Sequence, residues 1–71
     1  MRVYVVLKTF RADSFQDIFP NVIAIDDTIE EAIGVIADEC DTTVEEVENE
    51  LEENNCYDIA QARYTIFKYV N

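Results

Sequence analysis

Apolar and polar residues alternate with a period of two at both ends of the chain. From Arg2 to Thr9, one alternation carries Val3, Val5 and Leu7, and the other carries Tyr4, Val6 and Lys8. Arg63 to Val70 alternates in the same way and is also rich in β-branched and aromatic residues. This pattern is typical of β-strands. A shorter apolar run, Val22 to Ile25, predicts a third strand.

The middle of the chain has a helical period instead. Thr28 and Thr43 each precede a glutamate by three residues, which is the spacing of a capping box at a helix start. We therefore expect helices over Thr28 to Cys40 and Val44 to Asn54, the second ending near the asparagine pair. Ser14 to Phe19, ahead of Pro20, fits either one capped helical turn or a loop. The expected apolar stripes are Ile29, Ala32, Ile33, Ile36, Ala37 and Cys40 in the first helix, and Val44, Val47 and Leu51 in the second.

Together these elements predict a single α+β domain over residues 1–71. Two amphipathic helices follow the first strands and precede the last one, so the expected order is β-(β)-α-α-β. We expect a small, largely antiparallel sheet of three strands, with both helices on one face. A chain of this length has room for one modest hydrophobic core.

Charge is strongly segregated along the chain. The formal net charge is -11, from 16 acidic and 5 basic residues without histidine. Thirteen of the acids and none of the bases lie between Asp26 and Glu53. We therefore expect repulsion from nucleic acids and from anionic membranes, and basic protein surfaces as natural partners.

The remaining composition points to a cytoplasmic location. The chain holds no apolar run long enough to span a membrane, and its first residues lack a signal-peptide pattern. Cys40 and Cys56 have neither a CxxC spacing nor a histidine nearby, so we expect reduced, half-buried thiols and no zinc site.

The sequence argues against an enzyme. It has no histidine, one serine and no glycine-rich loop, so the usual nucleophile and general-base pairs are missing. The carboxylates around Asp41 do not follow the EF-hand spacing, which leaves only weak, nonspecific divalent binding. No metal site and no cofactor are expected.

The polar faces of the two helices are the candidate binding surface. Carboxylates four residues apart, such as Glu46 and Glu50, repel each other by about 0.2–0.5 kcal/mol, and a surface kept only for solubility would ordinarily mix in lysines. Glu52 and Glu53 also lie at the helix end that disfavours anions. A purely solubilising role is the alternative. The predicted partner-binding residues are Glu31, Val35, Asp38, Glu45, Glu46, Glu48, Glu50, Glu52 and Glu53.

Two further surfaces compete with this one. Val35 points away from the first helix's apolar stripe, either as an apolar anchor for a partner or as a contact for the Phe15 to Phe19 segment. The uncovered sheet face will carry one of the two alternations of each strand, and either is apolar enough for homodimer formation. A stacking surface for single-stranded RNA could be built from Arg2, Tyr4, Lys8, Tyr64 and Lys68, but the net charge opposes it.

Ile36 to Val47 resembles the helix-turn-helix of DNA-binding proteins in its apolar spacing. It departs from that family at Asp41, where a turn glycine is expected, and in glutamates along the second helix that would repel phosphates. In size, acidity and layout, with Asp26 to Glu53 as the relevant stretch, the chain resembles small phage proteins that block host defence, of the anti-CRISPR and DNA-mimic type. That resemblance implies an inhibitor that presents carboxylates to a nucleic-acid-binding protein. A regulatory or structural interaction module is the alternative.

Overall fold

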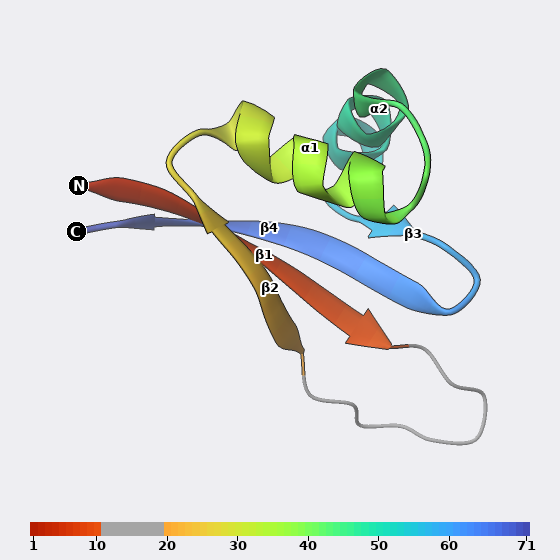
Figure 1. The fold of residues 1–71 in the computed structure, drawn as a ribbon, viewed down its shortest axis with the longest axis horizontal. Coiled ribbons are helices and arrows are strands. Elements are labelled where there is room, and N and C mark those ends of the chain that lie inside the picture. The colour runs from red at the N-terminus through yellow and green to blue at the C-terminus, as the bar shows by residue number, and fades with distance from the viewer. Residues whose placement is uncertain (11–19) are drawn as a thin grey trace.

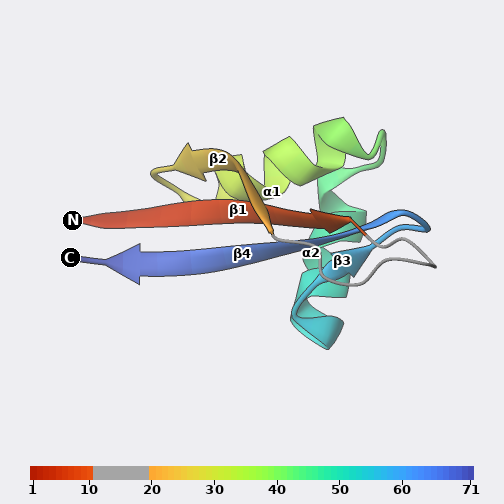
Figure 2. The ribbon, with the colours of Figure 1, turned by 90° about the horizontal axis from the view of Figure 1, so that it is seen from below.

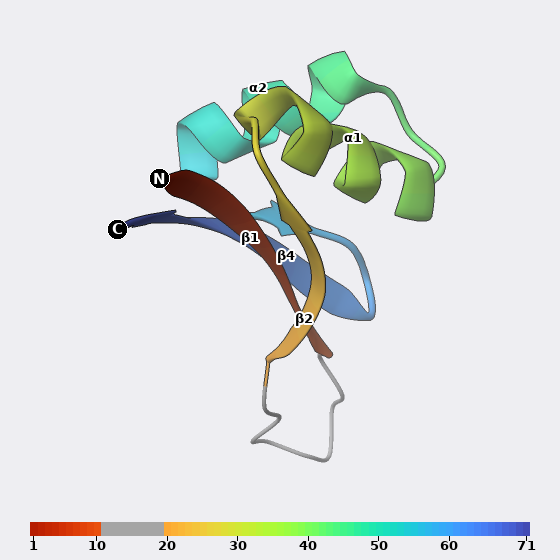
Figure 3. The ribbon, with the colours of Figure 1, turned by 60° about the vertical axis from the view of Figure 1, so that its left-hand side comes forward.

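A computed structural model describes residues 1–10 and 20–71. Its elements are β1 (Arg2–Phe10), β2 (Asn21–Asp26), α1 (Ile29–Glu39), α2 (Val44–Asn54), β3 (Tyr57–Asp58) and β4 (Ala62–Val70). The sheet is antiparallel in the order β2-β1-β4-β3. Both helices lie on the same side of the sheet (Figures 1 and 3). The α+β class and the helix positions are therefore confirmed.

The expected three-stranded sheet is wrong by one strand. β3 contains two residues and pairs with β4 through Tyr57 with Tyr64 and Asp58 with Arg63. A strand this short has no alternation that a sequence pattern can reveal, and it forms because the chain leaving α2 reaches the edge of β4. The helical turn proposed for Ser14 to Phe19 lies outside the described residues.

The two terminal strands form the centre of the sheet. β1 and β4 pair over nine residues without interruption and run side by side (Figure 2). The backbone N–H of Asn71 donates to the Met1 carbonyl at 2.8 Å, and the Met1 ammonium donates back at 3.1 Å. The ladder therefore extends to both chain ends.

Helix capping follows the sequence prediction. The hydroxyl of Thr28 accepts a hydrogen bond from the backbone N–H of Glu31 at 3.2 Å, and Thr43 does the same for Glu46 at 3.1 Å. Each bond satisfies one amide that would otherwise lack a partner in the first helical turn. Asp41, in the turn between the helices, has a φ of 55°. The position where a helix-turn-helix has glycine thus adopts the left-handed conformation that glycine favours.

The core lies between α1 and the two central strands. Its buried residues are Val6, Ala32, Ile33, Ile36, Ala37, Val47, Ala62 and Tyr64. The stripe of α1 is confirmed, but α2 contributes Val47 alone as a buried residue, with Leu51 half-buried. Val44 is 48% exposed, so its place in the predicted stripe of α2 is wrong. Val44, in the first turn of α2, is not among the residues that pack against the core.

Candidate functional site

The predicted binding residues lie on the outer side of the two helices. Seven of the nine are exposed, and two, Val35 and Glu50, are half-buried. The carboxamide of Asn54 donates to Glu50 at 3.0 Å, which ties that side chain to its own helix. The seven exposed carboxylates are Glu31, Asp38, Glu45, Glu46, Glu48, Glu52 and Glu53, and we call them the helical acidic surface.

No ion pair to this surface is found among the described residues. Within residues 1–10 and 20–71, the ion pairs found are Lys8 with Glu39, at 2.9 Å, and Arg63 with Asp58, at 2.8 Å. Neither includes a member of the helical acidic surface. The last turns of both helices also contain no basic residue. The carboxylates are therefore available to an external cation, at the cost of repulsion among themselves.

One polar cluster joins the end of α1 to the sheet face that the helices cover. The Lys8 ammonium and the Tyr64 hydroxyl both donate to the same carboxylate oxygen of Glu39, at 2.9 and 3.0 Å. The bond from Lys8, and then that from Tyr64, lowers the pKa of the Glu39 carboxyl. Burial, with a further contribution from Glu39, raises the pKa of Tyr64 to about 12. A phenol shifted this far from neutrality is a poor acid or base catalyst, so we assign the cluster a structural role.

The sheet face opposite the helices is also partly apolar. Val6 is buried under α1, and the register places Tyr4, Val6 and Lys8 on the helix side, so Val3, Val5 and Leu7 face away. Phe67 and Tyr69 lie on that same outer face and are 63% and 60% exposed. We call this the outer sheet face.

This arrangement hides part of the predicted RNA-stacking surface. Tyr64 is 1% exposed, and Lys8 is half-buried in the cluster with Glu39. Their alternation is the one that the helices cover, because Val6 between them is core. A base therefore has no access to the Tyr64 ring, which stacking requires.

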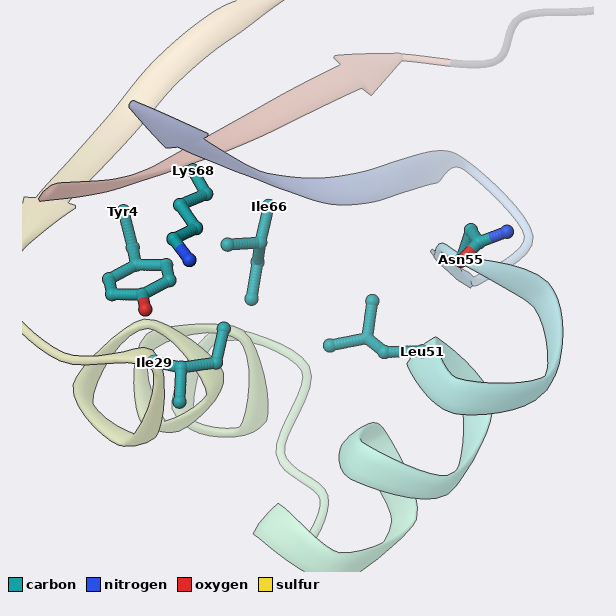
Figure 4. A pocket seen from close by; sticks show the side chains of 6 residues that line it. All are labelled: Tyr4, Ile29, Leu51, Asn55, Ile66 and Lys68. Carbon is teal, nitrogen blue, oxygen red and sulfur yellow. The ribbon is translucent and has the colours of Figure 1, made fainter. Parts of the chain in front are cut away.

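A small pocket opens where the helices meet the sheet (Figure 4). It has a volume of about 190 Å³, below the usual range for small-molecule sites, and suits a single side chain better. Apolar walls come from both helices and the sheet, and the polar groups come from both central strands and the end of α2. The lining residues are Tyr4, Ile29, Leu51, Asn55, Ile66 and Lys68.

The sequence pattern did not locate this pocket. Ile29 and Leu51 belong to the two helix stripes and Lys68 lies in the last strand, but nothing in the linear pattern brings these residues together. The pocket exists because α2 ends at Asn55, which takes a left-handed φ of 63° as the chain turns toward β3. Asparagine tolerates this conformation better than most residues, and the Asn54 and Asn55 pair was the available signal.

The described residues were also examined for reactive thiols, membrane-spanning helices and metal-binding clusters. Cys40 and Cys56 are half-buried free thiols there, as expected. No helix in the described part of the chain is long and apolar enough to cross a membrane. Across residues 1–10 and 20–71, no three histidine, cysteine or acidic side chains are grouped to hold a metal ion.

Comparisons with known proteins give no family for this chain. No protein-family model matches it. Neither a curated protein nor a solved structure gives a significant match. The functional argument therefore rests on the chemistry of the surfaces described above.

Proposed function

We propose that this protein binds a basic protein surface through the helical acidic surface. The observation that carries the proposal is the absence of any ion pair to these seven exposed carboxylates among the described residues, in a chain of net charge -11. Unshared carboxylates attract cationic partners over several ångströms and speed association. The partner class that presents dense positive charge is a nucleic-acid-binding protein, whose cationic residues otherwise contact phosphates.

In its specific form, the proposal is an inhibitor of the anti-CRISPR or DNA-mimic type. An exposed carboxylate can take the place of a phosphate as an acceptor for Arg and Lys side chains. The two helices present these acceptors from the same side of the sheet (Figure 3). Half-buried Val35 adds an apolar contact on α1. Such a protein would compete with nucleic acid for one site and would itself bind no nucleic acid.

The test uses charge variants of α2 that leave its buried residue in place. Glu45, Glu46, Glu52 and Glu53 are changed together to lysine, and in a matched control to glutamine, which keeps the side-chain size. Capture of partners from a lysate should fail for the lysine variant and weaken for the glutamine variant. Wild-type capture should also decline steeply with salt, because the Debye length falls from about 10 Å at 0.1 M to about 3 Å at 1 M.

Competition by nucleic acid completes this test. A duplex added at increasing concentration should release the captured protein from the wild-type chain. Circular dichroism must confirm that each variant is folded. If the folded lysine variant captures the same proteins as wild type, the helical acidic surface is not the binding site.

A second candidate function is self-association through the outer sheet face. It is favoured by Phe67 and Tyr69, two large exposed side chains on one strand of that face. Contiguous apolar patches of this kind often mark protein contacts. Changing Phe67 and Tyr69 together to serine would convert a sedimenting dimer to a monomer under this candidate.

A further inference from the structure

The outer edge of β4 is open along its second half. β3 pairs only with Tyr64 and Arg63, so within the described residues no strand lies beside β4 from Phe67 to Val70 (Figure 1). An open strand edge presents unpaired backbone donors and acceptors and is a template for an added strand. Two of the side chains along it, Tyr69 and Val70, are 60% and 65% exposed.

The ladder shows which backbone groups point out of this edge. Met1 and Asn71 exchange both hydrogen bonds, so they form a hydrogen-bonded pair of the antiparallel ladder. Such pairs alternate, so Tyr69 bonds to Val3 of β1, while Lys68 and Val70 direct their N–H and C=O groups to the open side. Ala62 is separated from Lys68 by an even number of residues, so its carbonyl points out of the same edge. It accepts a hydrogen bond there from the backbone N–H of Ile59, the residue after β3.

The pocket in Figure 4 lies along the same edge. Ile66 and Lys68 line it from β4, and Leu51 and Asn55 line it from the end of α2. A strand added beside Phe67 to Val70 would alternate its side chains between the two faces of the sheet. On the helix side, one of them would therefore meet the walls formed by Ile29, Leu51 and Ile66.

We propose that the open edge of β4 receives an extended, basic peptide segment of a partner protein, which adds to the sheet as a strand and places one apolar side chain in this pocket. This inference rests on the proposed function and names the form that the basic partner takes. Backbone bonds along a sheet edge provide affinity in this mode of recognition, and pockets for alternate side chains provide selectivity.

Charge decides the character of the segment. Glu48 and Glu52 are exposed neighbours of Leu51 and Asn55 on α2, so carboxylates border the helix side of the pocket. Lys68 lines the pocket itself and has no ion pair in the described part of the chain. A lysine or arginine is therefore disfavoured inside the pocket and favoured on either side of it.

Charge also argues against a second copy as the occupant. Two copies joined antiparallel through β4 would form one continuous sheet around a two-fold axis. Both α2 helices would then lie on the same face beside the junction, each with a net excess of carboxylates and no basic residue in its sequence. Each copy carries a net charge of -11, so their repulsion opposes this pairing.

The test compares two variants at one position. Lys68→Pro removes the outward N–H but no bond to β1, and proline is tolerated at such an edge. Lys68→Ala is the matched control, since it shortens the side chain and keeps the N–H. The probe is a capped synthetic peptide of alternating lysine and leucine, labelled for fluorescence anisotropy. We expect Lys68→Ala to bind at least as tightly as wild type, and Lys68→Pro to bind at least about tenfold more weakly.

Two modified probes separate this proposal from the general acidic surface. The same peptide with N-methylated leucines cannot form the backbone ladder and should lose binding, whereas a glutamate-for-lysine peptide should not bind at all. Equal binding of the N-methylated peptide, or no loss with Lys68→Pro, would overturn strand addition and leave charge-driven binding intact. Peptide binding unaffected by the α2 lysine variant would instead refute the helical acidic surface while leaving the edge site in place.

Sedimentation of the unliganded protein tests the remaining occupant. A monomer at all concentrations agrees with the proposal. A dimer that Lys68→Pro dissociates, but Lys68→Ala does not, would show that a second copy fills the edge and would overturn the peptide assignment.

Discussion

The attachment of α2 to the rest of the domain depends on Val47. This side chain is 0% exposed and is the one fully buried residue of the helix. Val47→Ala removes two methyl groups, worth about 1.6 kcal/mol at 0.8 kcal/mol each, and leaves a cavity that adds to the loss. We therefore expect the free energy of unfolding to fall by about 2–3 kcal/mol. A domain of this length typically has about 4–11 kcal/mol in total, so the loss is a large fraction of it.

Val44→Ala is the matched control, because Val44 lies one turn earlier on the same helix and is 48% exposed. Its loss of apolar contact is small, and alanine has the higher helix propensity, so the change should stay within about 0.5 kcal/mol. Urea unfolding followed by circular dichroism measures both variants, and the slope with denaturant should not change. Equal losses for the two variants, or a loss below about 0.5 kcal/mol for Val47→Ala, would refute the description of how α2 packs.

Two other expectations concern local geometry and titration. Asp41→Gly should raise the free energy of unfolding by about 0.5–1 kcal/mol, because glycine has no steric penalty at a φ of 55°; a decrease in urea midpoint would contradict this. The pKa of Tyr64 is raised from 10.0 to about 12, so its contribution to stability is complete below pH 10 and is lost as the pH rises through 12. The free energy of unfolding of Tyr64→Phe should therefore fall less than that of wild type between pH 10 and 12, as measured by urea titrations. At neutral pH the variant should be about 1 kcal/mol less stable than wild type.

At acid pH the same cluster loses stability through Glu39, because its pKa is shifted in the opposite direction to that of Tyr64. The pKa of Glu39 is lowered, first by the Lys8 bond and then by Tyr64, so this carboxylate stabilises the fold above its unfolded pKa of about 4.3 and loses that contribution as the pH falls below it. The tyrosine variant should lose less than wild type there as well. A wild-type stability curve that is flat at both extremes would contradict both assignments.

The helices and the long strands could be predicted because their information is local. Alternation predicts strands over Arg2 to Thr9 and Arg63 to Val70, and each observed strand is one residue longer. Threonine caps mark the starts of both helices within one residue. Whether the apolar residues of a segment repeat every two or every 3.6 positions depends only on residues close together in the sequence. The acidity of the helical surface is equally local, since an amphipathic helix turns its polar residues outward wherever it packs.

The sequence by itself thus determined the α+β class, the boundaries of α1 and α2, and the presence of an acidic helical layer. Only the tertiary structure decided which strand alternation the helices cover, because both Val3 and Val6 are apolar enough to be core. It also decided that Val44 is exposed and that β3 pairs for two residues. Within residues 1–10 and 20–71, it leaves the edge of β4 beside the pocket without a partner strand. These features depend on contacts between residues far apart in the chain, and a periodic pattern carries no information about which distant segment a surface will meet.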